Sequence, residues 1–293
     1  FARMREGAAS PEARANTRLL IGPWSHSNFT NVVGTLDYGR RSMGASLDLG
    51  PGISGTLIEW FKSQLGDGGN AEGPRVRLFV QGVNRWRDED DWPLASARPE
   101  SWYLRADGGL SRERPCTDES DATFVFDPRD PCPTCGGDLA RPPDYTPGPL
   151  DQAPILGRRD VLVYTTPVLE RDITVIGPVT ATLHAATTGR STDWVVKLCD
   201  VDERGRTLNI CDGIARVTQG DEGPVEIDLW GAAVVFQAGH RIRVLVTSSD
   251  FPRYERNPNT GEDPWTATRF EPCMQRVFHD ASRPSSIRLP LVR

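Results

Sequence analysis

The sequence predicts a mainly β protein, in which a short α/β segment precedes an antiparallel β-sandwich of the jelly-roll type. From about residue 74 onward, many short runs alternate between apolar and polar side chains, as strands with one buried face do. The residues before this point instead combine one short apolar run with one helical repeat. We therefore place the predicted domain boundary between residues 73 and 74, which gives the parts 1–73 and 74–293.

In the first part, the apolar run Leu19–Ile21 stops at Gly22-Pro23 and predicts the end of a strand. A helix near residues 53–65 is predicted because apolar residues recur there at helical spacing and form one face. These residues are Ile53, Leu57, Trp60, Phe61 and Leu65. The helix is expected to end at Gly66, since glycine commonly terminates helices.

In the second part, strands are predicted wherever a short alternating or apolar run lies between Gly, Pro and Asp turns. The runs are RVRLFV, SWYLRA, ATFVFD, VLVYTT, ITVIG, VTATLHA, DWVVKLCDV, RTLNICDGIARV, VEIDL, RIRVLV and SSIRLPLV. Two turn-rich insertions, residues 127–152 and 248–265, interrupt the strands. Insertions of this length inside a compact domain are usually functional or interfacial.

Composition narrows the classes of function. The formal net charge of -6 disfavours a nucleic-acid-binding role built on phosphate neutralisation. No apolar run approaches the ~18 residues that indicate a membrane-spanning helix. The six scattered cysteines do not form the framework of a small disulfide-rich protein. We therefore expect a soluble, cytoplasmic protein, and the arginine bias, with only Lys62 and Lys197 as lysines, suggests a bacterial source.

The start of the chain predicts a fragment. The first residue is Phe1, no signal peptide follows, and the opening stretch resembles the middle of a helix followed by a linker. The true N-terminus of the protein is therefore expected upstream of this residue.

His26 is the first candidate catalytic residue. It follows Gly22-Pro23-Trp24 at a strand end, and a histidine can act as a general base because it titrates at about pH 6.5. The alternative is a surface or capping histidine. Neither flanking serine is a natural partner, since neighbouring residues of an extended segment point to opposite faces. The chain holds no G-x-S-x-G nucleophile motif.

We predict structural roles for the remaining histidines and for a pair of cysteines. His184, His240 and His279 lack the close spacing of a metal site. Cys132 and Cys135 have C-x-x-C spacing, but prolines flank the pair and no second pair follows. We therefore expect neither a redox site nor a zinc site at these cysteines.

Several segments together resemble the CocE/NonD family of serine hydrolases, which includes cocaine esterase-like enzymes and X-Pro dipeptidyl-peptidases of the S15 type. They follow the family's order along nearly the whole chain and match its C-terminal half only. The segments are LLIGPWSH, GTLIEWFKSQLGDG, VRLFVQGVNRWRDEDDWP, DPRDPCPTCGG, DQAPILGRRDVLVYTTPVLERDITVIGPVTATL, DWVVKLCDV, CDGIAR and AGHRIRVLVTSSDFPRYERNPNTG. The resemblance implies that residues 1–73 are the C-terminal remnant of an α/β-hydrolase catalytic domain and that residues 74–293 form a galactose-binding-like jelly roll.

The resemblance also implies a Ser-Asp-His triad, of which this chain supplies only the histidine, His26. The serine and the aspartate are expected upstream of Phe1, so the 293 residues alone are predicted to be inactive. Trp24 is assigned to the substrate pocket. The loop residues assigned to the same pocket are Leu139, Ala140 and Arg141. Related esterases present apolar side chains from this loop, so Arg141 predicts a preference for an acyl group that carries a carboxylate.

The resemblance implies no cofactor and no metal. The expected partners are a small ester, an amide or a short peptide as substrate, and the missing N-terminal catalytic domain, against which the jelly roll would pack. A homodimer is compatible with the resemblance, whereas nucleic acid and membranes are not expected partners.

A non-catalytic β-sandwich module that binds carbohydrate or protein is the alternative function, because a fold alone does not fix function. The first 70 or so residues argue against it. A binding module has no use for a strand, a histidine-bearing tip and a helix that cannot complete their own sheet.

Overall fold

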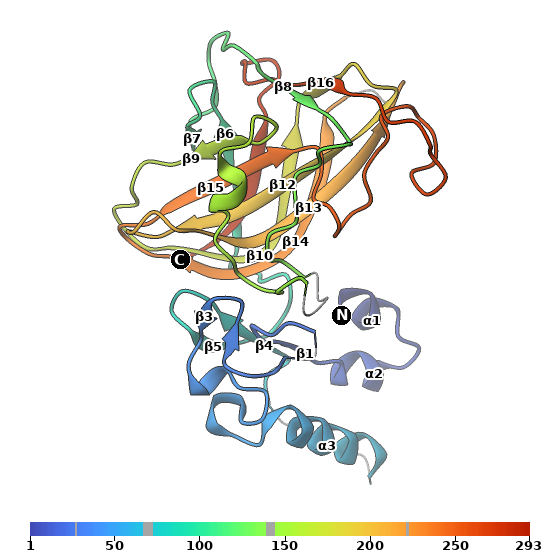
Figure 1. The fold of residues 1–293 in the computed structure, drawn as a ribbon. Coiled ribbons are helices and arrows are strands. Elements are labelled where there is room, and N and C mark those ends of the chain that lie inside the picture. The colour runs from blue at the N-terminus through green and yellow to red at the C-terminus, as the bar shows by residue number, and fades with distance from the viewer. Residues whose placement is uncertain (27, 67–72, 139–143, 221–222) are drawn as a thin grey trace.

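A computed structural model describes residues 1–26, 28–66, 73–138, 144–220 and 223–293. It shows a β-sandwich and, below it in Figure 1, a smaller α/β part that holds the N-terminus. The prediction of a mainly β protein is confirmed. Among the described residues, no helix has both the length and the apolar character needed to cross a bilayer.

The α/β part contains the predicted helix. Its elements are α1 (Ala2–Gly7), α2 (Pro11–Asn16), β1 (Leu19–Ile21), β2 (Val32–Val33), β3 (Leu36–Asp37), the 3-10 helices η1 (Arg40–Ser42) and η2 (Leu47–Leu49), and α3 (Gly52–Leu65). The backbone N–H of Gly66 donates to the carbonyl of Lys62 at 3.0 Å and ends α3 there. Much of the apolar face of α3 is not covered by the described residues: Leu57, Phe61 and Leu65 are all exposed.

A three-stranded sheet connects the two parts. Strand β4 (Val76–Val80) lies between β1, to which it is parallel, and the antiparallel β5 (Arg85–Glu89). Val76 and Leu78 of β4 are fully buried and belong to a cluster that includes Val235 of the sandwich. The boundary predicted after residue 73 therefore falls between two strands of one sheet, and it stays a prediction.

The sandwich core lies between a five-stranded sheet, in the order β14-β10-β17-β6-β7, and a four-stranded sheet, in the order β13-β12-β15-β9. A third sheet, β11-β16-β8, contributes to the same core. The elements are β6 (Arg98–Leu104), β7 (Leu110–Ser111), β8 (Ala122–Phe126), α4 (Ala153–Leu156), β9 (Leu162–Thr165), β10 (Ile173–Leu183), β11 (Ala185–Thr187), β12 (Ser191–Val201), β13 (Thr207–Thr218), β14 (Val225–Phe236), β15 (Arg241–Thr247), β16 (Cys273–Val277) and β17 (Ser286–Val292).

Strand β12 is buried on both faces. Trp194 points into the sandwich core, whereas Cys199 lies on the other face in a cluster with Cys132 of the first insertion. The two insertions are also joined to each other. The N–H of Phe251 donates to the carbonyl of Cys132 at 3.0 Å, and the N–H of Thr134 donates to the carbonyl of Phe251 at 2.7 Å. The insertions therefore cover the outer face of the four-stranded sheet.

Candidate active site

The residues after β1 turn sharply and are held by Trp24. A Cβ on Gly22 would collide with the indole of Trp24, so a larger residue at the strand end would have to displace this ring. The indole Nε1–H donates to the carbonyl of Ser42 at 2.7 Å, and the ring lies 5.6 Å from that of Phe29 and 5.8 Å from that of Trp86. The sequence predicts Trp24 as a pocket residue. Trp24 is among the residues that line a cavity, while its indole N–H anchors the turn.

His26 lies at the tip of this turn. The N–H of Asn28 donates to the carbonyl of Ser25 at 3.2 Å, which closes the turn and leaves the imidazole of His26 exposed. No hydrogen-bond partner of the imidazole is found within the part of the chain that the structure describes. Because β1 is parallel to β4, the histidine follows the carboxyl end of a parallel strand, where ligands of open α/β sheets bind.

His26 is one of the residues that line a cavity of about 360 Å³ between the α/β part and the sandwich. The α/β part contributes His26, Trp24 and Tyr38 to its lining. The sandwich and its insertions contribute Asp138, Asn209, Asp212, Trp230 and Arg253. Residues nearly 230 positions apart therefore meet at one site, and a cavity of this size suits a small organic group.

The neck of the first insertion is fixed beside this cavity. Gly137 and Gly148 exchange two backbone hydrogen bonds, of 2.9 and 2.7 Å. The carbonyl of Pro149 accepts from the N–H of Thr35 at 3.1 Å and from its hydroxyl at 3.2 Å, which ties the neck to the α/β part. On the sandwich side, the amide oxygen of Asn209 accepts from the N–H of Leu150 at 2.8 Å.

The loop that this neck carries includes three of the predicted pocket residues. Leu139, Ala140 and Arg141 lie outside the described residues, so their assignment stays a prediction. Asp138, directly before them, lines the His26 cavity.

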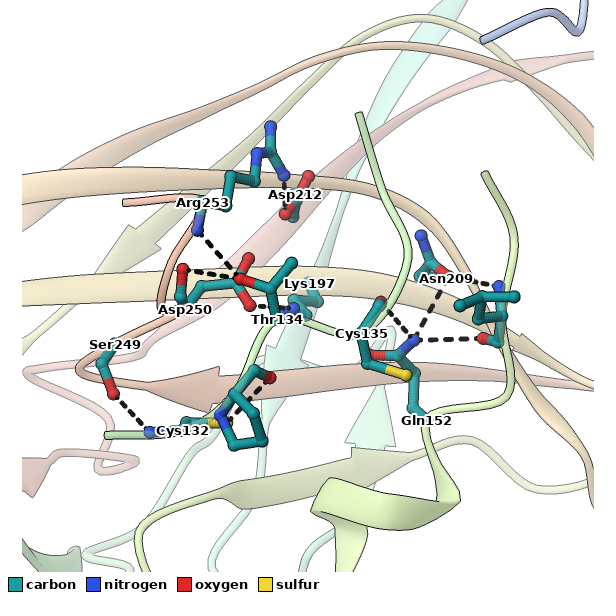
Figure 2. Close-up of polar contacts among 12 residues, drawn as sticks. Cys132, Thr134, Cys135, Gln152, Lys197, Asn209, Asp212, Ser249, Asp250 and Arg253 are labelled. Atoms are coloured by element: carbon teal, nitrogen blue, oxygen red, sulfur yellow. Dashed lines mark hydrogen bonds and ion pairs between the residues drawn. The ribbon is translucent and has the colours of Figure 1, made fainter. Parts of the chain in front are cut away.

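Arg253 of the second insertion connects this loop to the sheet. Its guanidinium forms an ion pair with Asp212 of β13 and a second one with Asp138 at 2.6 Å. Figure 2 shows the pairing with Asp212 and, close by, the bond of 3.1 Å from the Arg253 N–H to the hydroxyl of Thr134. Burial opposes the charge of Arg253, but the facing Asp212 outweighs this and raises the pKa of Arg253. The arginine therefore stays charged and holds three chain segments together.

A buried ion pair lies beneath this connection. Nζ of Lys197, on the outer face of β12, is 2.7 Å from Oδ1 of Asp250 (Figure 2). The two side chains are only 3% and 1% exposed. Burial opposes the charge of Lys197, but Asp250 outweighs it and raises the pKa of Lys197. The ammonium group therefore remains charged under the two insertions.

The other three histidines have structural surroundings. His279 is fully buried, with Nε2 at 2.8 Å from the hydroxyl of Tyr164 and Nδ1 at 2.9 Å from the carbonyl of Ser120. Nδ1 of His240 lies 2.9 Å from a carboxylate oxygen of Asp200. His184 is half-buried on the sandwich, and burial lowers its pKa.

The cysteines do not form a reactive centre. All six are free, and burial raises the pKa of Cys132 and of Cys199 to about 12, which keeps both as neutral thiols. Cys135 of the C-x-x-C pair places its sulfur 3.3 Å from the carbonyl of Asp151. Across the described ranges, no group of three or more His, Cys, Asp or Glu side chains is arranged to hold a metal ion.

Sequence patterns alone miss most of the cavity. Asp212 and Arg253 lie in the segments CDGIAR and SSDFPR, which contribute to the family resemblance without a role being assigned to them. Tyr38 and Trp230 carry no sequence signal, because their place in the cavity depends on how distant segments pack.

Comparisons with known proteins agree with this architecture. Residues 69–288 match the model of the X-Pro dipeptidyl-peptidase C-terminal non-catalytic domain. Cocaine esterase of Rhodococcus sp. (strain MB1 Bresler) is 36% identical over 303 residues, which cover 95% of this chain and 52% of that protein. An α-amino acid ester hydrolase structure is 30% identical with a TM-score of 0.82, and the match covers 94% of this chain and 50% of that one.

A CocE/NonD family hydrolase from Staphylococcus aureus shares the fold, with a TM-score of 0.59 at 13% identity over 97% of this chain and 55% of that one. This chain spans about half the length of the relatives it matches. It belongs to the CocE/NonD family of hydrolases and carries a C-terminal β-sandwich of the X-Pro dipeptidyl-peptidase type.

Proposed function

We propose that this chain supplies the triad histidine, His26, to a serine hydrolase that cleaves small esters, amides or short peptides. The observation that supports this most strongly is that the exposed His26 follows the carboxyl end of β1 and lines a cavity to which both parts of the chain contribute. The serine and the aspartate would come from the part of the family's length that this chain does not span.

In this mechanism, His26 takes the proton of the serine hydroxyl as the serine attacks the carbonyl carbon. The same imidazole then gives this proton to the leaving alcohol or amine. It next takes a proton from the water that attacks the acyl-enzyme and gives it to the serine oxygen as the bond between the serine and the acyl group breaks. The aspartate would orient the imidazole, which has no partner among the described side chains of this chain.

The rest of the catalytic domain would pack against the exposed face of α3. Leu57, Phe61 and Leu65 lie four residues apart on this helix, so they share one face. β1 ends its three-stranded sheet and is paired only with β4 among the described strands. An apolar helix face beside an open sheet edge fits the surface that a larger α/β domain covers.

The test is ester hydrolysis by the intact protein with His26→Ala. Removing a triad base costs on the order of 10⁶ in kcat in serine hydrolases, so we expect activity near background. His184→Ala is the matched control, because this histidine is outside the cavity lining and its replacement should leave kcat within about twofold. An intact protein that is inactive but binds a sugar or a protein would instead support the binding-module function.

The proposed acyl preference rests on Arg141, which follows Asp138 by three positions in the sequence of the first insertion. Arg141→Leu in the intact protein should lower the ratio of kcat/KM for a glutaryl ester over that for a butyryl ester. Loss of a single charge-assisted contact predicts a change of roughly 10-fold. An unchanged ratio would disprove the preference without touching the role of His26.

A further inference from the structure

Trp230 combines two unfavourable features on the wall of the His26 cavity. The residue is 72% exposed, although covering a tryptophan buries a large apolar area. Its backbone φ is 65°, in the left-handed region that bulky residues rarely adopt. The preceding Leu229 is fully buried, so the strand turns outward at this residue.

A β-bulge in β14 sets this conformation. Asp228 pairs with Thr180 of β10 and Gly231 pairs with Pro178, so two residues of β14 face a single residue of β10. Oδ1 of Asp228 accepts a hydrogen bond from the N–H of Trp230 at 2.8 Å. The bulge therefore directs Trp230 away from the sandwich core and into the lining of the cavity.

Two glycines make room for the bulge. A Cβ on Gly213 of the neighbouring β13 would collide with the carbonyl of Asp228, and one on Gly231 would collide with the ring of Trp92. The neighbouring residues thus hold the backbone of Trp230 in an unfavourable conformation, while its exposed indole contributes little to packing. Strained residues that are held in this way are concentrated at binding and catalytic sites.

We infer that Trp230 forms an aromatic wall of the substrate pocket and selects substrates that carry a flat ring. The inference rests on the proposed function, because it assigns a role in the cavity that His26 shares. The cavity of about 360 Å³ accommodates a group of this size, and an indole face favours stacking with a ring. Asp138 and Arg253 in the same lining offer polar partners to the rest of the substrate.

Trp230→Asn in the intact protein tests this role, since asparagine tolerates the left-handed conformation. We expect Tm to stay unchanged or to rise by about 2–4 °C as strain is relieved. We expect kcat/KM for a phenylacetyl ester to fall about 10-fold relative to that for an acetyl ester, and the Kd of free phenylacetate to rise about 10-fold. Trp230→Tyr keeps an aromatic ring and should change both quantities by less than about threefold.

Trp265→Asn is the matched control, because Trp265 is also exposed but is not among the cavity residues. This substitution should leave unchanged both the ratio of kcat/KM for the two esters and the Kd of phenylacetate. Equal losses for the two esters, or phenylacetate that does not bind or binds all variants equally, would overturn the inference. A fall in Tm of more than about 4 °C in Trp230→Asn would also overturn it, because the side chain would then serve stability.

Failure of the proposed function has a different signature. A protein without esterase activity that still binds phenylacetate through Trp230 would refute the role of His26 and support the aromatic wall. The binding measurement therefore decides the role of Trp230 independently of catalysis.

Discussion

Replacing Lys197 by methionine should destabilise the protein strongly, because it leaves a buried carboxylate without its cation. Nζ lies 2.7 Å from Oδ1 of Asp250, and Oδ2 of this carboxylate is buried with no hydrogen-bond partner among the described residues. Removing one partner of a buried ion pair costs about 3–5 kcal/mol. At about 2–4 °C per kcal/mol, Lys197→Met should lower Tm by about 6–20 °C.

The stability lost in Lys197→Met should increase with pH. Burial raises the pKa of the Asp250 carboxyl, and this effect grows once Lys197 is gone. A carboxyl whose pKa is higher in the folded state than in the unfolded state reduces stability as pH rises above the unfolded value of about 4. The stability difference between wild type and Lys197→Met should therefore be small near pH 4 and increase toward neutral pH.

Thermal unfolding of both proteins between pH 4 and pH 8 is the assay. Lys62→Met is the matched control, since Lys62 is the only other lysine and is exposed on α3, so its replacement should change stability by less than about 0.5 kcal/mol. The double variant Lys197→Met with Asp250→Asn should lose less stability than the sum of the losses in the two single variants, because both substitutions remove the same ion pair. A cost for Lys197→Met below about 1 kcal/mol at pH 7 would refute the reasoning, since surface pairs are of that size.

Two further predictions concern the strand end and the thiols. Gly22→Ala should displace the Trp24 indole from the carbonyl of Ser42. The free energy of unfolding should then fall by about 1–3 kcal/mol, and kcat should fall as well. Full activity of this variant would show that the turn tolerates a Cβ. Burial raises the pKa of Cys132 and Cys199 to about 12, so the free energy of unfolding should fall as pH rises from about 9 toward 12. In the native protein at pH 8, only the exposed Cys116 should react rapidly with a thiol reagent. Rapid labelling of Cys199 would contradict this prediction.

Alternating runs predicted most of the sandwich strands, because each such strand covers one face of the core. The run ITVIG and the first five residues of VTATLHA belong to a single strand, β10, whose pairing shifts register between Pro178 and Thr180. β5 was not predicted, since its sequence RWRDE is polar. It pairs antiparallel with β4, where Trp86 packs against the buried Phe79 and Arg77 binds Asp88 across the ladder through two hydrogen bonds of 2.6 and 2.7 Å.

The candidate site was only partly accessible to sequence reasoning. The residues around His26 predicted no more than a strand-end histidine, and its proposed catalytic role came from the family resemblance. The cavity depends on contacts between segments far apart in the chain, such as the Pro149 carbonyl with Thr35. The position of Trp230 depends on a bulge that no alternation pattern reveals, because the register shift is set by the neighbouring strands.

The apolar face of α3 shows the opposite case. Helical spacing identified the helix and its apolar stripe, but the stripe remains exposed at Phe61 and Leu65 in the described structure. Periodicity locates an apolar face and leaves open which surface covers it.

The central claim, that His26 is the general base of a serine hydrolase, is tested most directly by the rate at which a fluorophosphonate labels the intact protein. The reagent reacts with a serine that a neighbouring base has activated. We predict labelling of one serine in the wild type, slowed by roughly 10³-fold or more in His26→Ala and unchanged in His184→Ala. Labelling of His26→Ala at the wild-type rate, or no labelling of the intact wild type, would contradict the assignment.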